Sequence, residues 1–434
     1  MKGGFNVNKW GVLVSLVLLS SSAWAQTIRI GVLGPMAYLQ GRHTWYGATL
    51  AAEEINRAGG IQLNRRSYRI ELVRVDTNEM VSVPDAATAV ERAIVAQRID
   101  FLIGGFRSEA VLAMTEVAAE YRKIFLTTGS AAVGLTAGRV DQNYGRYKYI
   151  FRVSPYKATD IIQTTLLQLG EVIQTLRQQL NIPQPKVALL VERVLAWDPV
   201  IEPASRIISA PPPQGYGAEV VGVWRPSAVA TDLTSELTAI QRAGAQVIFT
   251  LLSGPAGTAF GREWGRLKIP AATVGANVDA QQGTWLEATS NLGNYVATIN
   301  FIAPDIAITP KTIPFVVNFR TRFREIPIYT ASGTYDALYI LADALKRANS
   351  LEADAVIEAL ETTDYVGVGG RYVFDKLHDV KWGPGYVTGI GVQWVDGRMV
   401  TFWPRNWRVG NQLVGYAGTR PYQLPPWVVE AWRR

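Results

Sequence analysis

One loop of the sequence combines glycine, cationic and hydroxyl residues in a pattern that suits an anion. It follows a short apolar run and reads Leu102-Ile103-Gly104-Gly105-Phe106-Arg107-Ser108, after which a helical pattern begins. Glycine allows the backbone to approach a ligand closely, and the free N–H groups at the start of a helix attract negative charge. A site for a carboxylate at this loop is therefore one interpretation of the sequence.

A second loop has similar chemistry. It runs from Leu126 through Thr127 and Thr128 to Gly129 and Ser130, again directly after an apolar run. The two loops together could hold a carboxylate through their hydroxyl and N–H groups. A structural interpretation remains open beside this one, in which Ser108 only caps the following helix and the threonines only turn the chain.

Catalytic residues are scarce in this chain. His43 and His378 are its two histidines, so a paired-histidine metal motif is excluded, and the glycine-rich motifs of nucleotide binding and the G-x-S-x-G motif are absent. Cysteine is absent as well, which excludes thiolate nucleophiles, thiolate metal sites and disulfides. We expect no catalytic residue, no metal and no cofactor. We expect His43 in the loop after the first strand and His378 in a solvated turn.

The net charge and composition indicate a folded protein without a nucleic-acid partner. Lys and Arg number 43 against 36 Asp and Glu, a formal charge of +7, with no run of basic residues. Hydrophobic residues make up 48% and charged residues 18%, as in globular domains. At 434 residues, two or three domains are expected.

Residues 1–25 have the pattern of a cleaved secretory signal peptide. Lys2 and Lys9 precede an apolar stretch over Gly11–Leu19, and Ala23-Trp24-Ala25 provides the small-residue cleavage pattern. Without a cysteine, the new N-terminus cannot carry a lipid anchor. We therefore expect a soluble protein that begins at Gln26 and resides in the periplasm.

Strand and helix patterns alternate through the rest of the chain, which predicts an α/β protein with parallel sheets in two lobes. Five prolines between Asp198 and Glu219 predict a loop there. Near the C-terminus, Asp396-Gly397 separates two apolar runs and predicts an antiparallel hairpin. Strands are expected at 28–33, 69–75, 101–103, 124–127, 187–191, 220–224, 247–252 and 273–275, and helices at 47–57, 85–98, 109–122, 161–180, 233–242, 257–267, 335–348 and 353–361.

Several stretches, in order, resemble the solute-binding proteins of branched-chain amino acid ABC transporters, the leucine-binding, type I class of periplasmic binding protein. They are Ile30–Pro35, Gly47-Ala48 through Glu54–Ile61, Leu102–Ser108, Ile150-Phe151-Arg152, Tyr335-Asp336-Ala337 through Leu345, and Phe374-Asp375 through Trp394. The resemblance implies two Rossmann-like lobes joined by three hinge crossovers near Arg152, 299–302 and 367–371. Lobe 1 would comprise 27–151 plus 302–366 and lobe 2 152–301 plus 367–400, with 401–434 as a tail packed on a lobe.

The resemblance also implies ligand contacts. Tyr38 to Gln40 correspond to an aromatic wall, and Trp197 corresponds to an aromatic residue of the second lobe. Ser108, Gly129 and Ser130 correspond to the groups that bind the ligand carboxylate, with Arg107 beside them.

Two positions depart from the family pattern. The acids that hold an α-ammonium group correspond to Lys157 and Asn277, and a lysine would repel that group. This departure favours a carboxylate-bearing solute that is not a simple α-amino acid. The alternative is that a gap shifts the comparison and that Asp160, Asp198 or Asp279 serves the ammonium.

The implied partners are a small-molecule solute and an inner-membrane permease, and a monomer is expected. Two other functions remain open at this point. One is a periplasmic sensor of the same fold, and the other, less favoured, is an exported hydrolase.

Overall fold

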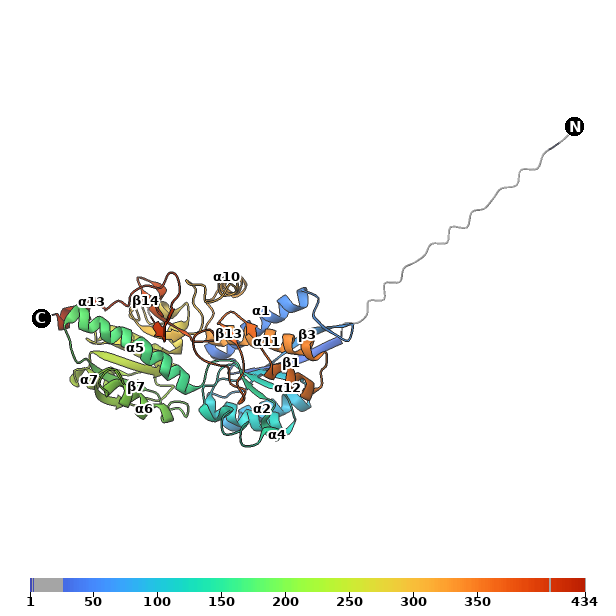
Figure 1. The fold of residues 1–434 in the computed structure, drawn as a ribbon, viewed down its shortest axis with the longest axis horizontal. Helices are drawn as coiled ribbons and strands as arrows, with labels where there is room; N and C mark the ends of the chain where they lie inside the picture. Colours follow the sequence, from blue (N-terminus) through green and yellow to red (C-terminus); the bar gives the residue numbers. More distant parts are fainter. Residues whose placement is uncertain (2, 4–25, 406, 434) are drawn as a thin grey trace.

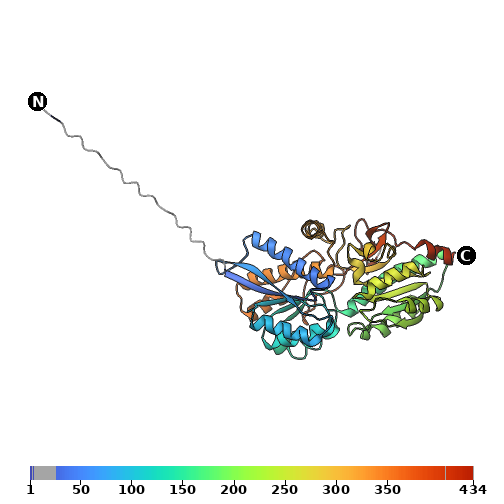
Figure 2. The ribbon, with the colours of Figure 1, turned by 180° about the vertical axis from the view of Figure 1, so that it is seen from behind.

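The computed structural model describes residues 1, 3, 26–405 and 407–433. Figures 1 and 2 show two α/β lobes side by side, with the C-terminal helix at the far end of lobe 2. The predicted fold class, two lobes with parallel sheets, is confirmed. Apart from residues 1 and 3, the predicted signal peptide lies outside the described residues. Within the described residues, no helix has the length and apolar character needed to cross a membrane.

Lobe 1 is built on a six-stranded sheet in the order β2-β3-β1-β4-β5-β6, parallel except for β2. Helices α1 and α11 pack together on one face, and α2 and α3 on the other (Figure 1). The strands are β1 (Gln26–Gly34), β2 (Ile61–Leu63), β3 (Arg66–Asp76), β4 (Phe101–Gly104), β5 (Phe125–Thr127) and β6 (Ile150–Arg152). The helices are α1 (Leu39–Arg57), α2 (Val83–Val95), α3 (Ser108–Glu120), α4 (Tyr144–Tyr147), α10 (Thr312–Phe323), α11 (Tyr329–Ala348) and α12 (Ala353–Glu361), with a 3-10 turn at Val133–Leu135.

Lobe 2 has a parallel sheet in the order β10-β9-β7-β8 and a smaller antiparallel sheet in the order β11-β14-β15. Alternation along β7 explains its two helical layers: Leu189 belongs to the apolar cluster that includes α5 and α6, and Leu190 to the cluster of α7 and α8. The strands are β7 (Lys186–Val191), β8 (Glu219–Trp224), β9 (Val247–Leu252), β10 (Ala272–Asn277), β11 (Ala297–Asn300), β14 (Ile390–Val395) and β15 (Arg398–Trp403). The helices are α5 (Ala158–Leu180), α6 (Asp198–Ser209), α7 (Thr234–Arg242), α8 (Ala256–Arg266) and α9 (Trp285–Ala288), with a 3-10 turn at Val278–Gln281.

The chain passes from lobe 1 to lobe 2 after β6 and returns between β11 and α10. Its third crossover lies further along the chain than the resemblance implies. Strands β12 (Tyr365–Val366) and β13 (Arg371–Tyr372) form a hairpin held on lobe 1, because the buried Asp336 carboxylate of α11 accepts the Val368 N–H at 2.9 Å. Beyond this hairpin, the first side-chain hydrogen bond to a helix of lobe 2 comes from Trp382, whose indole N–H donates to Thr164 of α5 at 2.9 Å.

The predicted loop between Asp198 and Glu219 is wrong over its first half, where the structure has helix α6. Pro199 lies at the start of the helix, where its missing N–H costs nothing, but Pro203 lies inside it. Val200, Ala204 and Ile208 recur every four residues and are buried. Burial of this apolar face outweighs the hydrogen bond that Pro203 removes.

The C-terminal segment covers lobe 2. The predicted tail boundary at residue 401 falls inside β15, so this part of the tail completes a sheet. A second hairpin follows, of β16 (Trp407–Val409) and β17 (Gln412–Val414), and then helix α13 (Pro426–Trp432). Trp427 of α13 packs on Trp264 with ring centroids 5.0 Å apart, and its indole N–H donates to Ile269 O at 3.0 Å.

Candidate functional site

A cavity of about 190 Å³ lies between the lobes, at the carboxyl ends of the sheet strands. Lobe 1 contributes the loops after β4 and β5 and the start of α11. Lobe 2 contributes the loops after β7, β8, β9 and β10. Most of the wall is apolar, and the polar groups in it converge from both lobes, as in a small-molecule site.

The loop after β4 forms one wall of the cavity. Gly104 has a φ of +119°, and a Cβ there would overlap the carbonyl oxygen of Leu33, so glycine is required. Arg107 and Ser108 follow and line the cavity. Arg107, not Ser108, is the N-cap of α3, and no side chain caps this helix, which contradicts the capping interpretation of Ser108.

Glu79 anchors this loop from behind. Its carboxylate accepts the N–H groups of Phe106 and Arg107, each at 2.9 Å, and the hydroxyl of Thr77 at 2.8 Å. The side chain is fully buried, and burial raises the pKa of Glu79 to about 7 against the lowering effect of these hydrogen bonds. The backbone N–H groups of Phe106 and Arg107 therefore bind Glu79 and cannot bind a ligand. The N–H groups of the first turn of α3, beginning with that of Ser108, make no hydrogen bond within the helix.

The loop after β5 faces the same space. Gly129 lines the cavity, and Tyr329 of α11 donates its hydroxyl to the Gly129 carbonyl at 3.1 Å. Ser130 is fully buried and lies 3.2 Å from Ser108, hydroxyl to hydroxyl. The two predicted loops thus meet through their serines.

Trp197 provides the apolar wall of lobe 2. Its indole N–H donates to the buried carboxylate of Glu192 at 3.3 Å, and the Ser253 hydroxyl donates to the same oxygen. Burial raises the pKa of Glu192, an effect that these hydrogen bonds partly offset. Its second carboxylate oxygen has no partner among the described residues. Glu192 fixes the positions of two cavity-lining side chains without lining the cavity itself.

Direct hydrogen bonds link the lobes around the cavity. The Gln40 amide of lobe 1 donates to Ser253 O of lobe 2 at 3.1 Å, and Leu195 N–H of lobe 2 donates to the Glu109 carboxylate at 2.9 Å. Tyr329 N–H also donates to the side chain of Gln281 across the interface at 3.3 Å. The structure is a closed arrangement of the two lobes.

The structure brings together four of the nine predicted ligand residues in the cavity wall: Arg107, Ser108, Gly129 and Trp197. Ser130 lies directly behind Ser108. The remaining four do not line the cavity, and they are Tyr38, Gln40, Lys157 and Asn277.

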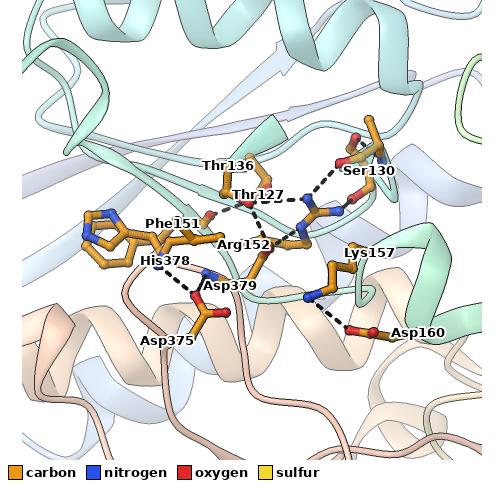
Figure 3. Close-up of polar contacts among 12 residues, drawn as sticks. Thr127, Ser130, Thr136, Phe151, Arg152, Lys157, Asp160, Asp375, His378 and Asp379 are labelled. Atoms are coloured by element: carbon orange, nitrogen blue, oxygen red, sulfur yellow. Dashed lines mark hydrogen bonds and ion pairs between the residues drawn. The ribbon is translucent and has the colours of Figure 1, made fainter. Parts of the chain in front are cut away.

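Each of those four has a local role. Tyr38 is the N-cap residue of α1, and Gln40 makes the interlobe hydrogen bond. Lys157 pairs with Asp160 at 3.7 Å (Figure 3). Asn277 is fully buried, and its amide donates to Gly257 O at 3.1 Å and accepts the Ala280 N–H at 3.3 Å. Neither Lys157 nor Asn277, the two positions that the resemblance set opposite an ammonium group, therefore lies in the cavity wall.

The three alternative acids are also engaged outside the cavity wall. Asp160 pairs with Lys157, Asp198 pairs with Arg225 at 2.7 Å, and Asp279 accepts the Thr258 hydroxyl at 2.7 Å. Glu109 is the one carboxylate in the wall as the described residues define it, and it contacts Arg107 at 3.4 Å.

Both histidines are buried, contrary to prediction. His43 lies inside α1, which starts eight residues earlier than expected; Ile328 N–H donates to its Nδ1 at 3.1 Å, so its Nε2–H donates to Glu325 at 2.8 Å. Burial lowers the pKa of His43, and this tautomer is the neutral one. His378 stacks on Phe151 at 3.9 Å between ring centroids. Neither residue lines the cavity.

Several lining residues were missed by the sequence analysis. Arg193, Gln281, Phe301 and Tyr329 come from four separate segments, and none has a local motif. A signal existed for Arg193 alone, because it follows the apolar run of β7 as Arg107 follows that of β4. Among the described residues, no cluster of three or more His, Asp or Glu side chains could hold a metal ion.

A family model described as periplasmic binding protein matches residues 27–390. The chain belongs to this family. It is 24% identical over 413 residues to Leu/Ile/Val-binding protein homolog 7 of Brucella suis, and the aligned region covers 90% of this chain and 95% of that protein. The family resemblance inferred from the sequence is confirmed, and the protein is a leucine-binding-protein-like, type I periplasmic binding protein.

Solved structures share its fold. A solute-binding protein of an ABC transporter from R. palustris, in complex with benzoate, has a TM-score of 0.69 at 18% identity and covers 87% of this chain and 95% of its own. The branched-chain amino acid substrate-binding protein LivJ from Streptococcus pneumoniae, in complex with isoleucine, has a TM-score of 0.69 at 20% identity, with coverage of 86% and 98%.

Proposed function

We propose that this periplasmic binding protein captures a small solute with a carboxylate and an apolar or aromatic body, and delivers it to an inner-membrane ABC permease. The charge of the cavity wall carries this proposal. The described lining residues include two arginines, Arg107 and Arg193, and one carboxylate, that of Glu109, which pairs with Arg107. A buried anion needs such an excess of positive charge, whereas an α-ammonium group would need a free acid.

The remaining wall suits the rest of such a molecule. Trp197, Phe301 and Tyr329 provide aromatic surface, and Ile161 and Ile299 provide aliphatic surface. Ser108 offers its hydroxyl to the carboxylate, and the Ser130 hydroxyl donates to Ser108 from behind. An aromatic acid, or an amino acid-like or amide-bearing acid of similar size, meets both requirements.

The comparisons support this ligand range. One similar structure holds benzoate and another holds isoleucine, so the fold accommodates aromatic acids and amino acids. The same proposal includes three properties that are typical of the family: delivery of the solute to a permease, a periplasmic location and the absence of enzymatic turnover. In this mechanism the ligand shifts an equilibrium toward the closed lobes, because it contacts both.

Calorimetric titration of an Arg107→Ala variant tests the charge argument. Benzoate and its neutral analogue benzamide are compared in the wild type, in the variant and in Arg206→Ala, a control that removes an exposed arginine of α6 away from the cavity. Loss of a charge-assisted contact is expected to weaken benzoate binding at least about tenfold, and benzamide binding far less. Equal losses for both compounds would contradict the role of Arg107.

A further inference from the structure

Arg152 does not line the cavity. It is the last residue of β6, where the chain crosses to lobe 2. Its side chain is completely buried. The Nε group donates to Asp379 at 2.6 Å, and the two Nη groups donate to the carbonyl oxygens of Ser130 at 3.3 Å and Ala132 at 2.6 Å (Figure 3). One guanidinium therefore holds two carbonyl groups of the loop after β5.

These carbonyls flank the residue that reaches the cavity. Ala131 lies between them and lines the cavity, and its own carbonyl accepts the Ala158 N–H of α5 at 2.7 Å. Three consecutive carbonyls are thus fixed from behind. Because their orientation determines where the intervening side chains point, the same anchors direct the Ser130 hydroxyl toward Ser108.

Asp379 ties the third crossover to the same point. Its second carboxylate oxygen accepts the Thr136 hydroxyl at 2.7 Å, and Arg152 N–H donates to His378 O at 2.9 Å. The His378 ring stacks on Phe151, the residue before Arg152 (Figure 3). The segment around Asp379 is therefore packed on β6, next to the first crossover.

We propose that Arg152 and Asp379 are positioning residues for the ligand: they hold the 129–132 loop in its binding conformation and join it to two interlobe crossovers. Neither residue contacts the cavity. This inference rests on the proposed function only in that a carboxylate is taken to meet Ser108, which the Ser130 hydroxyl supports from behind. The geometric part of the inference, that the Arg152 guanidinium fixes the conformation of the 129–132 loop, does not depend on the ligand.

A purely structural ion pair is the competing explanation, since breaking a buried pair destabilises a protein wherever it lies. Arg152→Lys separates the two. Lysine keeps the positive charge beside Asp379, but its single ammonium group cannot reproduce the planar fork that reaches both carbonyls. Asp336→Asn is the matched control, because Asp336 is also fully buried in lobe 1 and anchors backbone N–H groups, but in the β12–β13 hairpin.

Two readouts are measured under conditions in which all three proteins are folded. The first is benzoate affinity by calorimetry, and the second is hydrogen exchange of the amides in residues 129–136. Arg152→Lys is expected to weaken benzoate at least about tenfold and to accelerate exchange in this loop, whereas Asp336→Asn changes neither.

Unchanged exchange in Arg152→Lys would overturn the proposal, as would equal losses of affinity in both variants. If the wild type binds no benzoate, the proposed aromatic-acid ligand is contradicted separately. The exchange result then decides the positioning role: acceleration confined to residues 129–136 in Arg152→Lys supports it, and a wild-type pattern overturns it.

Discussion

Glu79 should make the stability of this protein depend on pH in a defined window. Its carboxyl group is fully buried, and its pKa rises from 4.5 to about 7 chiefly because of burial. The folded protein therefore retains a proton up to about pH 7 that the unfolded chain loses near pH 4.5. Since the folded state binds more protons between these values, the free energy of unfolding falls as the pH rises through the window and levels off above it.

The magnitude follows from the size of the pKa change. At about 1.4 kcal/mol per pH unit, a rise from 4.5 to about 7 removes about 3 kcal/mol of stability between the two ends of the window. Glu79→Gln should abolish this contribution. The amide resembles the protonated carboxyl group: its oxygen can accept the N–H groups of Phe106 and Arg107, and its NH₂ can donate to Thr77.

Urea denaturation of the wild type and Glu79→Gln, in steps from about pH 4.5 to about pH 8, measures the effect. The variant should gain about 3 kcal/mol relative to the wild type as the pH rises across this range. Other buried acids titrate too, so the difference between the two proteins is the quantity of interest. Glu120→Gln, an exposed residue at the end of α3, controls for the loss of a surface charge. A difference that does not change with pH would refute the reasoning.

Three further predictions concern the glycine turn, the tail and the cavity wall. Gly104→Ala should lower the free energy of unfolding by more than about 2 kcal/mol, because its Cβ would overlap a carbonyl. Gly383 has a similar positive φ but open space around it, so Gly383→Ala should lower the free energy of unfolding by less. Equal losses of the two variants in urea denaturation would contradict this explanation. Trp427→Ala should cost about 3 kcal/mol in thermal unfolding by uncovering the lobe 2 core, whereas Val409→Ala, an exposed residue of the tail, should cost little. Trp197→Ala should weaken benzoate at least about tenfold in calorimetry, and wild-type affinity would exclude Trp197 from the site.

The two site loops could be predicted because their chemistry is local. Gly104 ends β4 and is followed by Gly105 and Ser108. Gly129 and Ser130 come after β5, the next strand in the same sheet. The carboxyl ends of adjacent parallel strands share one edge, so the loops had to meet.

Residues placed by long-range packing could not be predicted from the sequence. His43 was expected in the loop after the first strand, but α1 begins at Leu39. The helix includes Gly41 and Gly47, where a Cβ would overlap the backbone of Pro35 and Ala331 respectively. The close approach of α1 to α11 selects glycine at position 47. A helix signal that is weak locally is thus restored by tertiary contact.

The predicted set of cavity-lining residues was incomplete for a related reason. Tyr329 and Gln281 reach the cavity from segments 48 residues apart and meet each other only across the lobe interface. Lys157 and Asn277 lie outside the cavity wall, and each is held by a local contact, with Asp160 and with Gly257 respectively. Trp197, which only the family resemblance indicated, lies in the cavity wall a few residues after β7.

Calorimetric titration of the wild-type protein with benzoate and with leucine tests the central claim most directly. The two arginines and the single carboxylate in the described cavity wall predict that benzoate, an acid without an ammonium group, binds more tightly than leucine. Tighter binding of leucine than of benzoate would contradict the proposed preference for an acid without an ammonium group.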